Sequence, residues 1–305
     1  MERQTSKRKR HHHRKHRYLG LKIFLGILAV LIIVGAGVAF GLYKSVENSF
    51  NSAYFKGPKT AAVNFKKSEP FSTLLLETGK VEGKENCVAA VVSSTNMKTR
   101  QTTFVNFPVT AELPNASVIS NVYQTNGLNG VLKNVQELLG IKVNKIVQIN
   151  INKLGELVEA TGGITIQNDE TFVSSGYQFN QGTIKLSTAN QVEAYLSRVN
   201  SNDEAASITR VQDVSMATYA NFKQIADKHS LSSINYYRNL LDAFGDSVKT
   251  DINFNEFKEI AVNYNKALFN TNKLNLHDSK DASGKLVVSD DDLNQMKALF
   301  IKSFK

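Results

Sequence analysis

The chain has 305 residues, of which 42% are hydrophobic, and a formal net charge of +10. Residues 1–22 hold nine Lys or Arg residues and one acid, which leaves 28 bases and 26 acids, a net charge of +2, for the rest. A nearly neutral main part argues against a nucleic-acid-binding protein, because phosphate contacts need clustered cations. Cys87 is the only cysteine. The sequence therefore excludes an internal disulfide and a lipid-modified cysteine near the N-terminus.

Residues 23–43 form an uncharged run of 21 residues directly after the basic tail. As an α-helix this run would extend about 32 Å, against about 30 Å for the hydrocarbon core of a bilayer. The length of this run predicts one transmembrane helix. Because Lys and Arg that flank a span tend to stay in the cytoplasm, we expect residues 1–22 inside the cell and the main domain outside it, in a single-pass cell-membrane protein.

A cleaved signal peptide is the alternative, because Gly37 and Ala39 near the end of the run are small enough for a signal peptidase site. The apolar region of a secretory signal is usually shorter, about 7 to 15 residues, which favours the transmembrane helix. A basic tail beside a span fits anionic lipid headgroups better than DNA. The expected partner is the membrane, with no nucleic acid.

Residues 44–70 are expected to form a stalk. Val46, Phe50 and Tyr54 are spaced to form a helix, which Gly57 and Pro58 end. The remaining residues are enough for one sizeable core. We divide them into a domain of residues 71–228 and a C-terminal helical extension, residues 229–305, packed on it.

The folded part shows alternating strand and helix patterns. Short apolar or β-branched runs predict buried strands at residues 73–76, 88–93, 102–107, 145–151 and 164–167. Helical spacing predicts helices at residues 128–139, closed by Gly140, and at 154–161. This alternation over short loops is typical of an α/β layered domain. In the second half the pattern predicts only helices, at residues 192–199, 208–225, 257–268 and 293–304.

The common catalytic motifs are missing from the sequence. It contains no Walker phosphate loop, no Gly-x-Ser-x-Gly elbow, no His-Glu-x-x-His and no Cys/His pair typical of a thiol enzyme. Residue chemistry alone therefore predicts an extracellular α/β module but does not indicate its function.

The order of several segments is more informative. The first strands and their loops, the helix that ends in Gly140 and the later glycine-rich stretches together resemble the LytR-CpsA-Psr family of cell-envelope proteins. The resemblance covers about residues 71–225. The segments that carry it are Leu74-Leu75-Leu76, Val91 to Thr99, Phe107-Pro108, Asn121 with Tyr123, Val135 to Ile141, Leu157 to Thr165, Phe179 to Ser187 and Gln191 to Leu196.

This resemblance implies a fold and an activity. Family members are membrane-anchored phosphotransferases that move a glycopolymer, such as teichoic acid or capsular polysaccharide, from an undecaprenyl-pyrophosphate carrier to peptidoglycan. The implied fold is α/β, with a central mixed sheet between helical layers and an apolar tunnel for the lipid. Arginines at the tunnel mouth hold the pyrophosphate, and carboxylates hold Mg²⁺, a hard cation that prefers oxygen ligands.

Most of these site residues are substituted here. Only Arg210 keeps its position, Arg198 is one place out of register, and Asn86 offers a neutral oxygen where the family has a magnesium carboxylate. A shift by one residue turns a helical side chain by about 100°. The candidate catalytic residues are therefore Arg210 and Arg198, and the candidate metal ligand is Asn86. The family's other motifs fall on Glu77-Thr78-Gly79, Glu85-Asn86-Cys87, Pro108-Val109-Thr110 and Ser207.

Carboxylates that could substitute for the missing ligands are Glu77, Glu82, Glu85, Asp203 and Glu204. Losing several arginines and the metal would remove about 5 to 10 kcal/mol of transition-state binding. The favoured interpretation is a catalytically impaired accessory or lipid-binding envelope protein that has lost its Mg²⁺. An active transferase with relocated residues is the first alternative, and a surface adhesion or scaffold protein is the second.

Overall fold

The computed structural model describes residues 43–198, 204–228 and 234–305. Within these ranges no helix is both long enough and apolar enough to cross a membrane. The predicted span at residues 23–43 lies outside them, apart from Tyr43.

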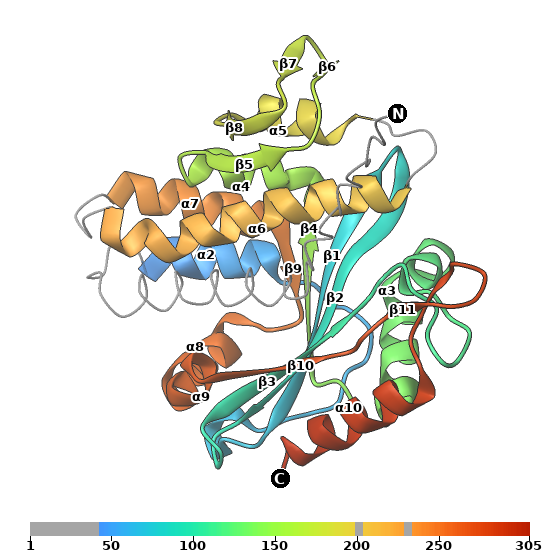
Figure 1. The fold of residues 1–305 in the computed structure, drawn as a ribbon. Coiled ribbons are helices and arrows are strands. Elements are labelled where there is room, and N and C mark those ends of the chain that lie inside the picture. Colours follow the sequence, from blue (N-terminus) through green and yellow to red (C-terminus); the bar gives the residue numbers. More distant parts are fainter. Residues whose placement is uncertain (1–42, 199–203, 229–233) are drawn as a thin grey trace.

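A six-stranded mixed sheet forms the centre of the molecule (Figure 1). Its strands, in spatial order, are β10 (Thr271–Asn275), β3 (Gln101–Phe107), β2 (Lys84–Asn96), β1 (Phe71–Val81), β4 (Lys145–Asn150) and β9 (Val248–Thr250). β1 and β4 are parallel, as are β10 and β3, and the other neighbours are antiparallel. The central mixed sheet expected from the sequence is confirmed.

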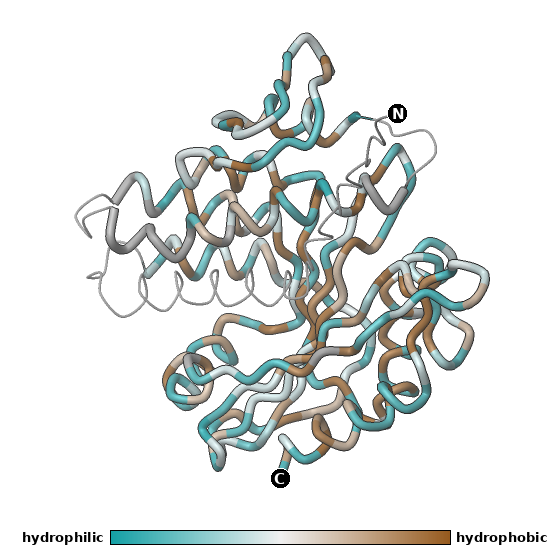
Figure 2. Tube along the Cα trace, in the orientation of Figure 1, coloured by the Kyte–Doolittle hydropathy of each residue, from teal (hydrophilic) through white to brown (hydrophobic). Residues whose placement is uncertain are grey.

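Helices cover both faces of this sheet. Leu74 and Leu76 of β1 pack in one apolar cluster with α3 (Ile119–Leu139) and α10 (Asp290–Lys302). Leu75 points to the opposite face, because side chains alternate along a strand. There it packs with α2 (Tyr43–Ala53), α7 (Ile234–Ser247) and α8 (Phe254–Asn263). Figure 2 shows hydrophobic residues along the central strands, between these helices.

A smaller group of elements stands at one end of the sheet, at the top of Figure 1. In it, β5 pairs with β8, and β6 with β7 as a hairpin. α6 runs from this group across β2 and β1. The group comprises η2 (Ile151–Lys153), α4 (Leu154–Ala160), β5 (Ile164–Asn168), β6 (Phe172–Ser174), β7 (Tyr177–Phe179), β8 (Gly182–Leu186), α5 (Ala189–Leu196) and α6 (Glu204–Lys228).

The predicted helix closed by Gly140 is present and longer than expected. α3 ends at Leu139, and Gly140 follows with a left-handed φ of 64° that suits glycine. The helix also extends back to Ile119, across an irregular turn at Gly127, whose φ is 59° and ψ is −155°. Because this turn breaks the apolar periodicity, the sequence pattern showed only the half after Gly127.

The C-terminal part contains strands as well as helices. β9 and β10 are the two edge strands of the central sheet, in a region where the sequence predicted only helices. Each has five residues or fewer and pairs with a strand more than 95 residues away in sequence. Local periodicity carries no signal for such pairing. The remaining elements are η1 (Phe65–Lys67), α9 (Asn265–Phe269), β11 (Ser279–Lys280) and β12 (Leu286–Val287).

The helix predicted within residues 44–70 lies directly against the domain. Val46, Phe50 and Ala53 of α2 are buried, and the Phe50 ring stacks on that of Phe257 at a centroid distance of 4.1 Å. Thr60 then donates a hydrogen bond of 3.0 Å to Asp251, next to β9. α2 is therefore part of the apolar core, through its contacts with α7 and α8.

Replacing Phe50 with alanine tests this role of α2. We expect Phe50→Ala to lower the free energy of unfolding by about 3 to 5 kcal/mol, the usual cost of removing a buried phenyl ring. Urea denaturation of the detergent-solubilised chain measures it, with Asn51→Ala, an exposed neighbour on the same helix, as the control. Equal stability of the two variants would show that α2 contributes nothing to the core.

Candidate functional site

The candidate site lies where α6 crosses the β1–β2 hairpin. The Ser207 hydroxyl of α6 donates a hydrogen bond of 2.6 Å to Glu82 in the hairpin turn. One turn later, the Gln212 amide donates a bond of 2.6 Å to the Val88 carbonyl of β2. These two contacts fix the first turns of α6 on the hairpin and so position Arg210 between them.

Arg210 and Arg198 are brought into direct contact. Arg210 Nη1 donates a hydrogen bond of 3.0 Å to the Arg198 carbonyl, and Arg198 Nη2 lies 2.8 Å from Glu170 Oε2. Burial lowers the pKa of Arg210, and the neighbouring Arg198 cation lowers it further. Tyr195 and Glu170 act in the opposite direction. Arg198 Nη1 is buried and has no hydrogen-bond partner in the part of the chain that the structure describes.

Aromatic rings line this pair of arginines. The Arg198 guanidinium carbon lies 4.4 Å from the centroid of the Phe172 ring, and that of Arg210 lies 5.8 Å from Phe172 and 5.9 Å from Tyr195. The ring faces attract cations and replace part of the hydration that burial removes. Burial also raises the pKa of Tyr195 to about 12, so its hydroxyl stays neutral.

Sequence reasoning missed Glu170 and Phe172. They lie on the β5–β6 loop and on β6, about 40 residues before Arg210, and belong to no recognisable motif. Their only signal is spatial, because the loop after β5 brings them to the end of α5, next to Arg198.

A second polar group lies at the end of β1. The Gln148 amide on β4 donates hydrogen bonds of 2.7 Å to the Thr78 hydroxyl and 2.9 Å to the Tyr123 hydroxyl. Burial raises the pKa of Tyr123, so this hydroxyl is also neutral near pH 7. Asn86 is fully buried on β2, opposite Gly79 of β1, and thus lies in the β-ladder rather than in the contact between the two arginines.

Glu77 is a fully buried carboxyl group at a register shift of β1. Burial raises its pKa from 4.5 to about 8. The Ser215 hydroxyl of α6 approaches and partly offsets this effect, although its geometry falls short of a hydrogen bond. Burial likewise raises the pKa of the nearby Cys87 thiol, which donates to the Ala89 carbonyl at 3.3 Å. Burial therefore favours the uncharged form of both groups.

The other candidate carboxylates are spread out. Glu82 and Glu85 are exposed at the hairpin turn, Asp203 lies outside the described residues, and the side chain of Glu204 is not among those described. Within the described part of the chain, no three His, Cys, Asp or Glu residues gather closely enough to hold a metal ion.

Comparison with known proteins now identifies the family. A model of the LytR_cpsA_psr family matches residues 39–301. The chain belongs to this family. Two relatives are named polyisoprenyl-teichoic acid–peptidoglycan teichoic acid transferase TagU. The one from Enterococcus faecalis is 31% identical over 264 residues, which cover 81% of this chain and 85% of the relative. The one from Bacillus mycoides is 25% identical over 266 residues, which cover 83% and 85%.

Solved structures share the fold of this LytR-CpsA-Psr protein. A Streptococcus agalactiae protein matches with a TM-score of 0.56 and 21% identity, covering 81% of this chain and 91% of the other. TagV of B. subtilis matches with a TM-score of 0.52 and 14% identity, covering 78% and 98%. TagT bound to LIIa-WTA matches with a TM-score of 0.52 and 16% identity, covering 83% and 98%. At these identities the likeness shows the mixed α/β fold alone.

Gly79 stands where the family resemblance places a magnesium carboxylate, and the backbone disfavours a side chain there. Its φ is +148°, and an added Cβ would lie 2.7 Å from Cγ1 of Ile151. We expect Gly79→Ala to destabilise the protein by at least about 1 kcal/mol more than Gly83→Ala. Gly83 also has a positive φ, of +79°, but nothing lies within 4 Å of an added Cβ there. Gly83→Ala therefore measures the cost of backbone strain without a clash. Thermal or urea unfolding of both variants measures the difference, and equal losses would contradict the predicted clash.

Glu77 predicts a pH dependence of stability. Between pH 4.5 and about 8 the folded protein retains a proton that the unfolded chain releases, so stability falls as pH rises through this window. The full pKa difference corresponds to at most about 5 kcal/mol. Urea unfolding at pH 5, 6.5 and 8 should show a steep loss in the native chain and a shallower one in Glu77→Gln. The same slope in both proteins would show that Glu77 is ionised in the fold.

Proposed function

We propose that this LytR-CpsA-Psr protein is anchored in the cell membrane by residues 23–43 and binds a polyprenyl-pyrophosphate-linked glycopolymer outside the cell. Its transfer chemistry is impaired, so it acts in an accessory or lipid-binding role. The relatives named as teichoic acid–peptidoglycan transferases support teichoic acid as the polymer class and peptidoglycan as the neighbouring partner.

One observation carries the binding part of this proposal: Arg198 Nη1 is buried without a partner among the described residues, beside the guanidinium of Arg210. A buried cationic donor that lacks an acceptor is costly, and a phosphate oxygen would satisfy it. Guanidinium groups also match phosphate geometry with paired N–H donors. Two adjacent arginines over the Phe172 ring thus offer a binding site for a pyrophosphate.

The impairment rests on the groups around this pair. The carboxyl of Glu77 is neutral at pH 7, Asn86 carries a neutral amide, and Gly79 has no side chain. The described residues present no cluster of three metal-binding side chains. The groups at positions 77, 79 and 86 therefore do not fit the Mg²⁺ that the family resemblance implies. With two arginines and no anionic ligands at these positions, charge developing on a leaving pyrophosphate is weakly stabilised.

A working transferase with relocated residues is the second candidate. The observation that favours it is the Glu82 carboxylate at the hairpin turn, which accepts a hydrogen bond of 2.6 Å from Ser207, three residues before Arg210 on α6. In this candidate Glu82 is the carboxylate that acts on a bound phosphate, and the relative that is 31% identical is named a transferase.

Binding assays with the detergent-solubilised full chain test the arginines. A polyprenyl pyrophosphate should bind more tightly than the monophosphate, because two phosphate groups reach both cations. Arg198→Ala and Arg210→Ala should each weaken binding about 10- to 150-fold, the effect of losing about 1.5 to 3 kcal/mol. Arg238→Ala, an exposed arginine on α7, is the matched control and should change nothing. Unchanged binding in both site variants would remove the pyrophosphate site from this proposal.

The same proteins in a transfer assay with a lipid-linked glycopolymer and peptidoglycan separate the two candidates. The accessory role predicts no turnover, with or without Mg²⁺. Turnover in the native chain that disappears in Glu82→Gln or Arg210→Ala would establish the relocated transferase instead.

A further inference from the structure

We infer that one face of the domain rests on the lipid headgroups of the membrane that carries the chain. This face is formed by the start of α2, the exposed side of α8 and a cationic end made of Lys67, Arg100 and Lys266, and we call it the headgroup face. The inference depends on the proposed anchoring, but it concerns the orientation of the domain and not its binding site.

The point of attachment leaves little freedom for the domain. The uncharged run of the sequence ends at Tyr43, which is also the first residue of α2. Val46, only three residues later, is already buried in the core with α7 and α8. Three residues of helix span about 4.5 Å, so the start of α2 must lie at the membrane surface if residues 23–43 cross it.

The side chains at this point are those that favour a membrane interface. Tyr43 is half exposed, and its ring meets Phe254 of α8 edge-on at 5.4 Å. Lys258 Nζ lies 4.8 Å from the centroid of the Phe254 ring and donates to the Tyr43 hydroxyl at 3.4 Å. Tyrosine and lysine gather at headgroup level, because each has an apolar body and a polar tip.

α8 extends this surface with an exposed apolar residue. Val262 is 72% exposed and follows Lys258 by four residues, so both lie on one side of the helix. α8 also packs against η1, the short helix that ends at Lys67. A single exposed valine needs no explanation in a soluble domain, but here it adjoins the predicted end of the membrane span.

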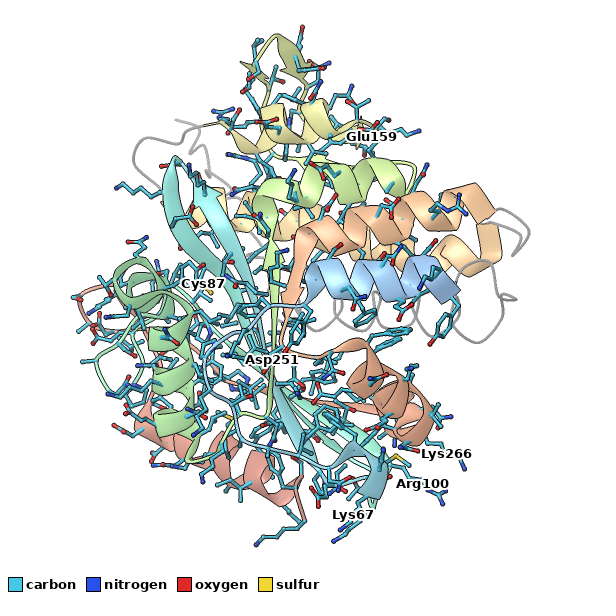
Figure 3. All side chains as sticks on the ribbon, turned by 180° about the vertical axis from the view of Figure 1, so that it is seen from behind. Lys67, Cys87, Arg100, Glu159, Asp251 and Lys266 are labelled. Carbon is cyan, nitrogen blue, oxygen red and sulfur yellow. The ribbon has the colours of Figure 1, made fainter. Side chains whose placement is uncertain are left out.

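The cationic end continues the same side of the molecule. Figure 3 shows Lys67, Arg100 and Lys266 gathered at one end of the sheet, beside α8 and α9. The Asn270 amide, which follows α9, donates to the Arg100 carbonyl at 2.9 Å and holds the β2–β3 turn there. In the described part of the chain, none of the three cations forms an ion pair. Cations near the surface of an anionic bilayer are attracted to its headgroups.

The experiment uses the full chain in vesicles of phosphatidylglycerol and phosphatidylethanolamine that carry a headgroup-linked quencher. A fluorophore on Val262→Cys should be quenched several-fold more than one on Leu299→Cys. Leu299 is the matched control, because it is 55% exposed on α10, on the opposite face of the sheet. The native Cys87 is buried and should not react with the label.

A charge-reversed variant tests the cationic end. Lys67→Glu, Arg100→Glu and Lys266→Glu, combined in the Val262→Cys chain, should reduce the quenching in these vesicles and leave it unchanged in neutral ones. Equal quenching at positions 262 and 299 would overturn the headgroup face. The headgroup face would also be overturned if a soluble anionic polymer bound the native cationic end while position 262 stayed unquenched. The three cations would then bind that polymer and not the lipid headgroups.

Flotation of the same vesicles after a carbonate wash separates this inference from the proposed function. A chain that floats but is not quenched at position 262 retains its anchor, and only the orientation fails. A chain that is released by the wash contradicts the anchoring itself, and the headgroup face with it.

Discussion

Burial of both faces of β1 and β2 is the constraint on which the rest of this structure depends. Every residue of β1 except Lys80 is buried, as is β2 after its first two residues. A sheet buried on both sides needs two helical layers, and one layer alone would leave Leu75 or Leu76 in water. The chain builds one layer from α3 and α10 and the other from α2, α7 and α8. The segments at both ends of the described chain are therefore parts of the core.

Polar contacts tie these distant segments together at the edge of the sheet. The Asp251 carboxyl, labelled in Figure 3, accepts hydrogen bonds from the Ile146 amide of β4 and from Thr60, which follows α2. Next to it, the buried Lys145 forms an ion pair of 2.7 Å with Glu256 at the start of α8. A buried carboxylate is stable only with such partners. These bonds link α8 and the segment that follows α2 to the edge of the sheet.

The candidate site combines the fold of the family with residues that differ from the family's motifs. The hydrogen bonds of Ser207 and Gln212 hold α6 on the β1–β2 hairpin, and Arg210 of α6 bonds to the Arg198 carbonyl. The residues around it differ, because Arg198 is held by Glu170 and Phe172, and Glu77 is buried as a neutral acid. In such a site, affinity for a pyrophosphate depends on donors that are already in place, whereas transfer requires additional charge stabilisation.

The sequence by itself determined the parts of this protein that local patterns encode. Strands β1 to β5, the helix that ends at Gly140 and the α/β class follow from apolar periodicity and turn residues. The family followed from segments in their order along the chain, and the resemblance also named Arg198 and Arg210 as candidate site residues. These signals are local, so they can be recognised in the sequence without knowledge of the fold.

The tertiary structure decided what depends on pairing between distant residues. β9 and β10 join the sheet through partners far away in sequence, and the turn at Gly127 conceals the first half of α3. No motif marks Glu170 or Phe172, which become parts of the site only because the loop after β5 returns to the end of α5. The neutral state of Glu77 likewise depends on how completely α6 and the sheet exclude water from it. Burial and long-range contact are properties of the packed molecule, so no window of the sequence contains them.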